Sequence, residues 1–261
     1  MEGYVKSEFN NGITTIEFFH PQSNSLPGKL LEELAQEIHA AGNNEDSKVI
    51  IFRSSGDKAF CAGASFDELK AIQNAEQGFR FFSGFANLIN AIRTCPKFII
   101  GRIHSVCVGG GVGLAAACDY AIAIETSDVK LSELAIGIGP FVVGPAIERK
   151  IGLAAFSQLA IDAGVWRNAQ WAGRKGLFTE VHPTVVGMDD SIRRLAHTLS
   201  QSNPEAMAEM KKLFWNGTEH WDQLLIDRAR ISGRLVLSEF TSQAITKFNQ
   251  NNCRSQNQNY P

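Results

Sequence analysis

The stretch CVGGGVGLAAACD, Cys107–Asp119, holds four glycines within five positions and then a run of alanines. Glycine lets a ligand or a second backbone segment come into contact with the main chain, because it has no side chain to keep them apart. Three uses of such a stretch are open: binding a phosphate, stabilising a developing oxyanion, and close helix packing. The rest of the sequence has to decide among them.

One reading is a dinucleotide site. Gly111-Val112-Gly113-Leu114-Ala115-Ala116 fits the pattern GxGxxG/A, and Glu133 follows about twenty residues later, where a ribose-binding acid would stand. The glycine turn of such a site follows its strand directly. Here the predicted strand at residues 98–100 is separated from the glycines by residues 101–105 and beyond. The spacing therefore disfavours a dinucleotide.

A second stretch of small residues favours the oxyanion reading. Ala59–Leu69, AFCAGASFDEL, lies between a predicted buried strand and a predicted helix. Each of the two stretches thus follows a strand and opens a helix, whose first N–H groups are free and lie at the positive end of the helix dipole. Two such donors that converge on one oxygen would form an oxyanion hole.

Hydrophobic periodicity predicts strands that alternate with helices in the first part of the chain and helices alone in the last part. This order predicts an α/β core with a helical C-terminal region. The expected strands are 4–9 and 13–19 (a hairpin), 49–52, 98–100, 120–124 and 129–131. The expected helices are one opening at Pro27, then 66–94 with a break near Gly78, one through Ala117, then 142–151, 153–163, 185–201, 204–215, 218–236 and 238–248.

Composition excludes several classes of protein. The chain has 261 residues, 44% of them hydrophobic and 20% charged, and a formal net charge of -2. This balance gives no support for binding to nucleic acid or to a membrane surface. No apolar run reaches the roughly 18 residues of a membrane span, and the N-terminus lacks an apolar signal segment, so a cytoplasmic or organelle-matrix protein is expected, with the cytoplasm favoured. Buried thiols are expected for the cysteines, which are Cys61, Cys95, Cys107, Cys118 and Cys253.

With these motifs in order, the sequence resembles the crotonase, or enoyl-CoA hydratase/isomerase, superfamily over most of its length. The resembling segments are Phe19–Leu26 ("NRP…NAL"), Ala59–Leu69 ("AFCAGADLKEL"), Pro96–Gly111 ("KPVIAAVNG…GGG"), Cys118–Tyr120 ("CDY"), Leu131–Pro140 ("PE…LGI.P") and Ala172–Val181 ("GLV..V"). The resemblance implies a spiral of ββα turns over residues 1–200. It also implies a helical trimerisation region over residues 201–261, ending in a frayed tail, and assembly as a homotrimer or a dimer of trimers.

The resemblance also implies the site. The N–H groups of Ala62 and Gly110 match the positions that hold the thioester oxygen, and Glu133 matches a catalytic glutamate. Ser23, Leu26, Ala62, Ala64 and Gly110 match substrate-binding positions along the coenzyme A path. Coenzyme A is part of the substrate, so no separate cofactor is expected. The histidines show no spacing typical of metal ligands, so no metal is expected.

One departure from the family decides the predicted reaction. Hydratases of this family commonly carry a second glutamate at the position that is Gly113 here. A single carboxylate suits the transfer of a proton from C2 to C4 of a 3-enoyl thioester, so double-bond isomerisation is favoured. Hydration, including hydration of branched glutaconyl thioesters, other enolate chemistry and non-catalytic acyl-CoA binding remain open. Ser65, where many members have Asp, loosens the substrate prediction further.

Other polar residues near the two loops have simpler explanations. Asp67 and Glu68 open a helix, where its dipole favours acids. Asp119 is expected to be structural, and His104 a partly buried histidine rather than a base. Phe66 and Phe141 are expected in the core or in a pocket wall.

Overall fold

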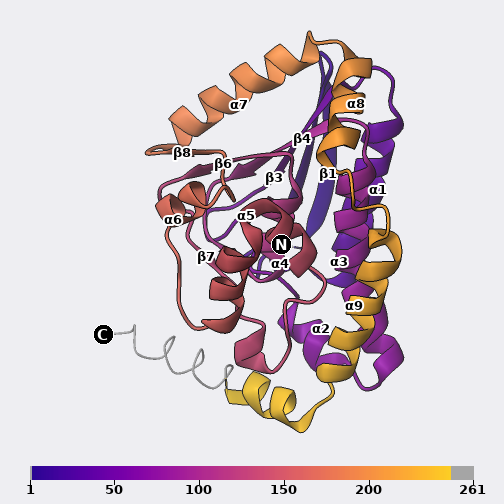
Figure 1. The fold of residues 1–261 in the computed structure, drawn as a ribbon, viewed down its shortest axis with the longest axis vertical. Helices are drawn as coiled ribbons and strands as arrows, with labels where there is room; N and C mark the ends of the chain where they lie inside the picture. Colours follow the sequence, from indigo (N-terminus) through magenta and orange to yellow (C-terminus); the bar gives the residue numbers. More distant parts are fainter. Residues whose placement is uncertain (1, 248–261) are drawn as a thin grey trace.

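A six-stranded sheet forms the centre of the computed structural model, which describes residues 2–247 (Figure 1). Its order is β1-β2-β3-β4-β6-β8, and β5 and β7 form a separate parallel pair. The strands are β1 (Tyr4–Asn10), β2 (Ile13–Phe19), β3 (Val49–Ser54), β4 (Phe98–Ile103), β5 (Cys107–Val108), β6 (Tyr120–Ile124), β7 (Val129–Lys130) and β8 (Glu180–His182).

The predicted hairpin is confirmed. β1 and β2 pair antiparallel across the two-residue turn Asn11-Gly12, in which both residues have positive φ (49° and 82°). Asn-Gly is the sequence that such a turn favours, because both central residues need that conformation. All other neighbours in the sheet are parallel, so each needs a crossover segment, and these segments carry the two glycine-rich loops.

Helices cover the sheet and continue along the C-terminal part of the chain. They are α1 (Gly28–Asn43), α2 (Phe66–Ala71), α3 (Ala75–Thr94), α4 (Gly110–Ala117), the 3-10 turn η1 (Leu134–Ile136), α5 (Gly144–Ile161), α6 (Ala169–Arg174), α7 (Val185–Ser200), α8 (Pro204–Phe214) and α9 (Trp221–Leu235). Residues 239–247 are also helical. The last residue of the expected helix 238–248 lies outside the described residues, and so does the expected frayed tail.

The predicted break near Gly78 is wrong. The helical stretch breaks at residues 72–74, and Asn74 caps the new helix α3 through a hydrogen bond from the Gln77 N–H group to its side chain. Gly78 instead serves a helix crossing, since a Cβ there would lie 2.6 Å from the carbonyl oxygen of Gly233 in α9. In Figure 1, α3 and α9 accordingly run side by side.

In the second half of the chain, the expected division into helices 142–151 and 153–163 is confirmed. They correspond to the two parts of α5, which are separated by non-helical backbone angles at Gly152 (φ 77°, ψ 159°). The sequence did not predict α6 or β8, both of which are too short to show periodicity.

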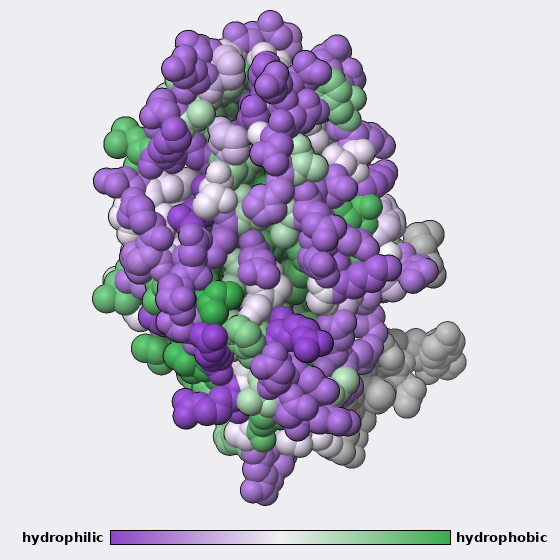
Figure 2. Space-filling view, turned by 90° about the vertical axis from the view of Figure 1, so that its right-hand side faces the viewer, coloured by the Kyte–Doolittle hydropathy of each residue, from purple (hydrophilic) through white to green (hydrophobic). Residues whose placement is uncertain are grey.

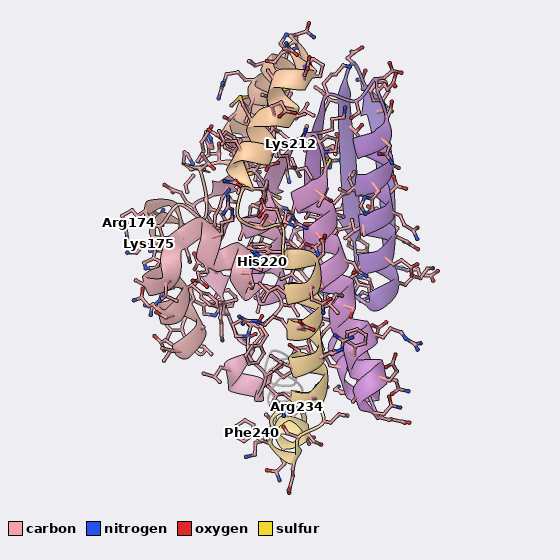
Figure 3. All side chains as sticks on the ribbon, turned by 45° about the vertical axis from the view of Figure 1, so that its right-hand side comes forward. Arg174, Lys175, Lys212, His220, Arg234 and Phe240 are labelled. Carbon is pink, nitrogen blue, oxygen red and sulfur yellow. The ribbon has the colours of Figure 1, made fainter. Side chains whose placement is uncertain are left out.

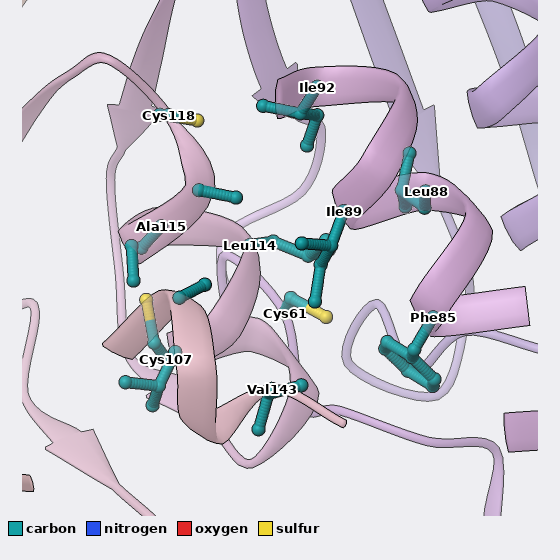
Figure 4. Packing of buried hydrophobic residues seen from close by; sticks show 14 of the residues in the cluster. Cys61, Phe85, Leu88, Ile89, Ile92, Cys107, Leu114, Ala115, Cys118 and Val143 are labelled. Atoms are coloured by element: carbon teal, nitrogen blue, oxygen red, sulfur yellow. The ribbon is translucent and has the colours of Figure 1, made fainter. Parts of the chain in front are cut away.

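The main core lies between the sheet, α1, α3 and α4. Figure 4 shows Leu114 of α4 packed near Ile89 of α3, with Cys61 and Cys107 close by. A smaller apolar cluster on the other face joins Met188 and Ile192 of α7 to the strands. Cys61, Cys95, Cys107 and Cys118 are buried free thiols, as predicted, and Cys253 lies outside the described residues.

The face that carries α1, α3 and α9 is mainly hydrophilic, with small separated hydrophobic areas (Figure 2). Within residues 2–247 no helix combines the length and the apolar character needed to cross a membrane.

Candidate functional site

The two glycine-rich loops lie against each other. The Val108 N–H donates to the Cys61 carbonyl at 2.9 Å, and the Phe60 N–H donates to the Val106 carbonyl at 3.0 Å. A Cβ at Gly111 would lie 2.3 Å from the Cys61 oxygen, so only glycine allows this approach. The small residues of both loops therefore bring the N-terminus of α4 onto the segment before α2.

Two glycines with positive φ shape the contact. Gly63 has φ 87° and Gly109 has φ 52°, conformations that favour glycine. A Cβ at Gly63 would lie 3.3 Å from the backbone nitrogen of Gly110. The main chain of one loop thus passes directly beside the first N–H group of α4.

The free N–H groups differ in part from the predicted pair. The Ala62 N–H, expected to hold a thioester oxygen, donates instead to the Ser23 carbonyl at 3.2 Å. The N–H groups of Ala64 and Gly110 donate to no group within residues 2–247. Leu26 forms a parallel β-bridge with Ala64, in which its backbone bonds to the residues on either side, Gly63 and Ser65. In such a bridge the N–H of Ala64 itself points away from Leu26.

The segment Ser23–Leu26 supports the first loop. The Leu26 N–H donates to the Gly63 carbonyl at 2.8 Å, and the Ser65 N–H donates to the Leu26 carbonyl at 3.1 Å. Asn24 adds side-chain bonds to two carbonyls, those of Ser55 and Ala59, both at 2.8 Å. The Leu26 side chain is fully buried, so it supports the loop; contact of Ser23 or Leu26 with a substrate stays a prediction.

Glu133 reaches the same place from the segment after β7. Its Oε1 atom lies 3.0 Å from the position that a Cβ would take at Gly109, and its Oε2 atom is buried with no hydrogen-bond partner among the described residues. Burial raises the pKa of the Glu133 carboxyl from 4.5 to about 7, and its own backbone N–H opposes the rise. A buried carboxyl with a near-neutral pKa can both accept and return a proton.

A narrow pocket of about 60 Å³ lies between these groups. Glu133, Ala64 and Gly110 all line it, and most of its other lining residues are apolar. The apolar wall includes Phe66, Leu69, Phe82, Phe85, Ile136 and Phe141. The expectation that Phe66 and Phe141 line a pocket is confirmed. A hollow of about 1190 Å³ between α1, α3 and α9 shares none of these residues.

The position of Gly113 is closed by packing. A Cβ there would lie 2.5 Å from the Cβ of Val143, just before α5, so the place of a side chain at residue 113 is already filled. Val143 also lines the pocket, and Figure 4 shows it beside the first turn of α4. The sequence has glycine where the family pattern has a second glutamate, and the packing leaves no space for a glutamate side chain there.

Comparison with known proteins decides the family. The enoyl-CoA hydratase/isomerase family matches residues 8–247 of this chain. The chain belongs to that family. The predicted resemblance to the crotonase superfamily and the predicted fold are confirmed, and family membership supports the prediction that the chain is an enzyme.

Individual members of the enoyl-CoA hydratase/isomerase family show how varied the relatives are. The mitochondrial methylglutaconyl-CoA hydratase of Rattus norvegicus is 31% identical over 217 residues, covering 81% of this chain and 68% of the relative. The peroxisomal Delta(3,5)-Delta(2,4)-dienoyl-CoA isomerase of Arabidopsis thaliana is 26% identical over 240 residues, covering 84% of each. A crystal structure of enoyl-CoA hydratase from Bacillus halodurans has the same fold, with TM-score 0.86, 22% identity and coverage of 94% of this chain and 99% of that one.

Other acids of this family member have structural partners. Glu68 accepts the Gly28 N–H at the start of α1 at 2.8 Å, and Asp67 accepts from Gln22 at 2.7 Å. Asp119 pairs with the buried Lys211 at 2.8 Å, as expected of a structural residue. His104 is partly buried and lies outside the pocket. In the described part of the chain no three His, Cys, Asp or Glu side chains gather as metal ligands would.

Five pocket residues were missed by sequence reasoning. Phe82 and Phe85 come from α3, Val142 and Val143 from the turn before α5, and Ser232 from α9. A Cβ at Gly110 would lie 2.3 Å from Phe85 Cε1, so this ring covers the start of α4. None of the five belongs to a motif, and only the folded chain brings them to the pocket that Glu133 lines.

Proposed function

We propose that this protein isomerises the double bond of an enoyl thioester of coenzyme A, with Glu133 as the single proton carrier. Two features observed together carry the proposal. The Glu133 Oε2 atom is buried without a hydrogen-bond partner among residues 2–247, and Val143 fills the space that a side chain at residue 113 would need. One carboxylate suffices to move one proton, whereas the hydratases that the family pattern describes use two.

In the proposed reaction the Glu133 carboxylate takes a proton from C2 of a 3-enoyl thioester. The C–H electron pair moves into the C2–C1 bond, and the thioester oxygen becomes an enolate oxygen. When the enolate collapses, the double bond moves from C3–C4 to C2–C3, and the protonated Glu133 returns its proton to C4. Such general acid–base catalysis contributes about 10²–10⁴ in rate, and it works best when the pKa of the group lies near the working pH.

The enolate oxygen is held, in this proposal, by the N–H groups of Ala64 and Gly110. Both lack a hydrogen-bond partner within residues 2–247, and Gly110 is the first residue of α4, at the positive end of its dipole. Ala64 replaces Ala62 as the predicted first donor, because the Ala62 N–H is already bonded to Ser23. Removal of one such donor costs about 10²–10³ in rate.

An isotope experiment tests the reaction. The protein is incubated with a 3-enoyl-CoA and, separately, with a 2-enoyl-CoA in ¹⁸O-labelled water, and each product is examined by mass spectrometry. Isomerisation predicts a 2-enoyl product of unchanged mass and no ¹⁸O. Rapid formation of a 3-hydroxyacyl product containing ¹⁸O from a 2-enoyl-CoA, without isomerisation of the 3-enoyl-CoA, would refute the proposal.

Hydration is the second candidate, and the 31% identity to a methylglutaconyl-CoA hydratase favours it. Glu133 would then have to hold and activate the water alone. The same experiment separates the two reactions, because only hydration transfers solvent oxygen.

The assembly and location expected from the sequence are also proposals. A homotrimer or dimer of trimers in the cytoplasm, built through residues 201–261, remains the prediction. Light scattering of the purified full chain gives its mass, and a monomer would contradict the proposed assembly.

A further inference from the structure

Aromatic and aliphatic side chains from several elements line the pocket. Phe66 and Leu69 belong to α2, Phe82 and Phe85 to α3, and Ile136 to η1. Phe82 and Phe85 are almost fully buried. A hydrocarbon chain would replace water there at a gain, whereas a polar group would lose its hydration.

The ionisable groups that line the described pocket are of one sign only, acidic. Among the lining residues of the described chain, Glu133 is the sole ionisable side chain, and no Lys, Arg or His takes part. Ser132 and Ser232 also line the pocket, and Ser232 is only 1% exposed.

The cations of the neighbouring helices α2 and α9 do not line the pocket. Lys70 of α2 lies 3.9 Å from Asp67. Arg230 of α9 bonds to Asp227 at 3.0 Å and stacks on Phe79. Arg234, near the lower end of α9 in Figure 3, is exposed. A carboxylate at the end of an acyl chain would therefore find no counter-charge in the described pocket and would be repelled by ionised Glu133.

We infer that this site accepts thioesters of uncharged acyl chains and rejects chains that end in a second carboxylate. The apolar wall and the lack of a cation among the described lining residues make this selection. The inference rests on the proposed function in that a thioester must bind at Glu133. It separates this chain from its relative in Rattus norvegicus, whose name specifies methylglutaconyl, a group with a second carboxylate.

Calorimetry of the full chain with butyryl-CoA and glutaryl-CoA tests the inference. Both acyl chains are saturated, so binding is measured apart from double-bond chemistry, and they differ at the chain end by the carboxylate. Glutaryl-CoA is expected to bind about 100-fold more weakly, because an unpaired carboxylate loses its hydration in an apolar pocket. A preference of tenfold or more supports the inference, and a smaller one overturns it.

A matched pair of variants places the selectivity in the pocket. Ile136→Arg puts a cation into the wall and is expected to narrow the preference for butyryl-CoA by about tenfold or more. Leu134→Arg adds the same charge on the same short helix at a side chain that is 51% exposed and outside the pocket, and it is expected to leave the preference unchanged. Equal effects of the two variants would overturn the assignment to the pocket wall. If Ile136→Arg does not fold, the comparison on the unmodified chain still decides the inference.

The outcomes also separate this inference from the proposed function. If neither thioester binds, the proposed thioester site itself fails. If both bind with similar affinity and Glu133 still isomerises a 3-enoyl-CoA, only the inferred selection against a carboxylate fails.

Discussion

Replacing Glu133 by glutamine tests the buried carboxyl through stability as well as through activity. Burial raises the pKa of this carboxyl from 4.5 to about 7. A raised pKa stabilises the folded state fully below the unfolded pKa, and this contribution is lost as the pH rises through the folded pKa. In the unmodified protein the contribution of Glu133 to the free energy of unfolding should therefore fall between about pH 4.5 and pH 7. Glu133→Gln, which does not titrate, should show no such fall.

The size of the effect follows from the two pKa values. Each pH unit between them corresponds to about 1.4 kcal/mol, so the full difference is roughly 3 kcal/mol, and relaxation around the carboxylate reduces it to about 2 kcal/mol. We expect the free energy of unfolding of Glu133→Gln, relative to the unmodified protein, to rise by about 2 kcal/mol from pH 5 to pH 8.

Urea unfolding at pH 5 and pH 8 measures this change. Glu148→Gln, at an exposed position on α5, is the matched control and should show little change between the two pH values. Turnover of Glu133→Gln should fall by about 10²–10⁴, while acyl-CoA binding persists. If the difference in unfolding free energy between Glu133→Gln and the unmodified protein is the same at both pH values, the pKa of the Glu133 carboxyl is not raised by burial. If Glu133→Gln keeps full activity, Glu133 is not the base.

Three further predictions follow from the packing and the site. Gly113→Glu should lower the free energy of unfolding by about 1–3 kcal/mol, because its Cβ would overlap Val143, and adding Val143→Ala should recover part of the loss in urea unfolding. Gly78→Ala should cost about 1–3 kcal/mol at the α3–α9 crossing, whereas Gly164→Ala, with no heavy atom within 4 Å of the new Cβ, should change stability by less than about 0.5 kcal/mol; equal effects would contradict the crossing. The pH profile of kcat/KM should rise to a plateau above about pH 7, because the reaction needs the Glu133 carboxylate, and a profile flat from pH 5 to pH 8 would contradict this.

Local patterns in the sequence determined much of the fold. Asn11-Gly12 fixed the hairpin, and alternating apolar segments predicted most strands and helices. Short elements such as α6 and β8 carry too few residues for periodicity to register. Gly78 misled the prediction because glycine in a helix serves a close helix crossing as well as a break, and the crossing partner, Gly233, lies 155 positions later in the chain.

For the site, the sequence by itself determined which groups are present: two glycine-rich loops, one candidate glutamate at 133, and glycine in place of a second acid at 113. The tertiary structure decided which of those groups are free. The Ala62 N–H donates to Ser23, the Ala64 N–H has no acceptor in the described part of the chain, and Val143 fills the space beside Gly113. The physical reason is that hydrogen bonding and packing depend on which distant segments meet, and local sequence patterns do not record those meetings.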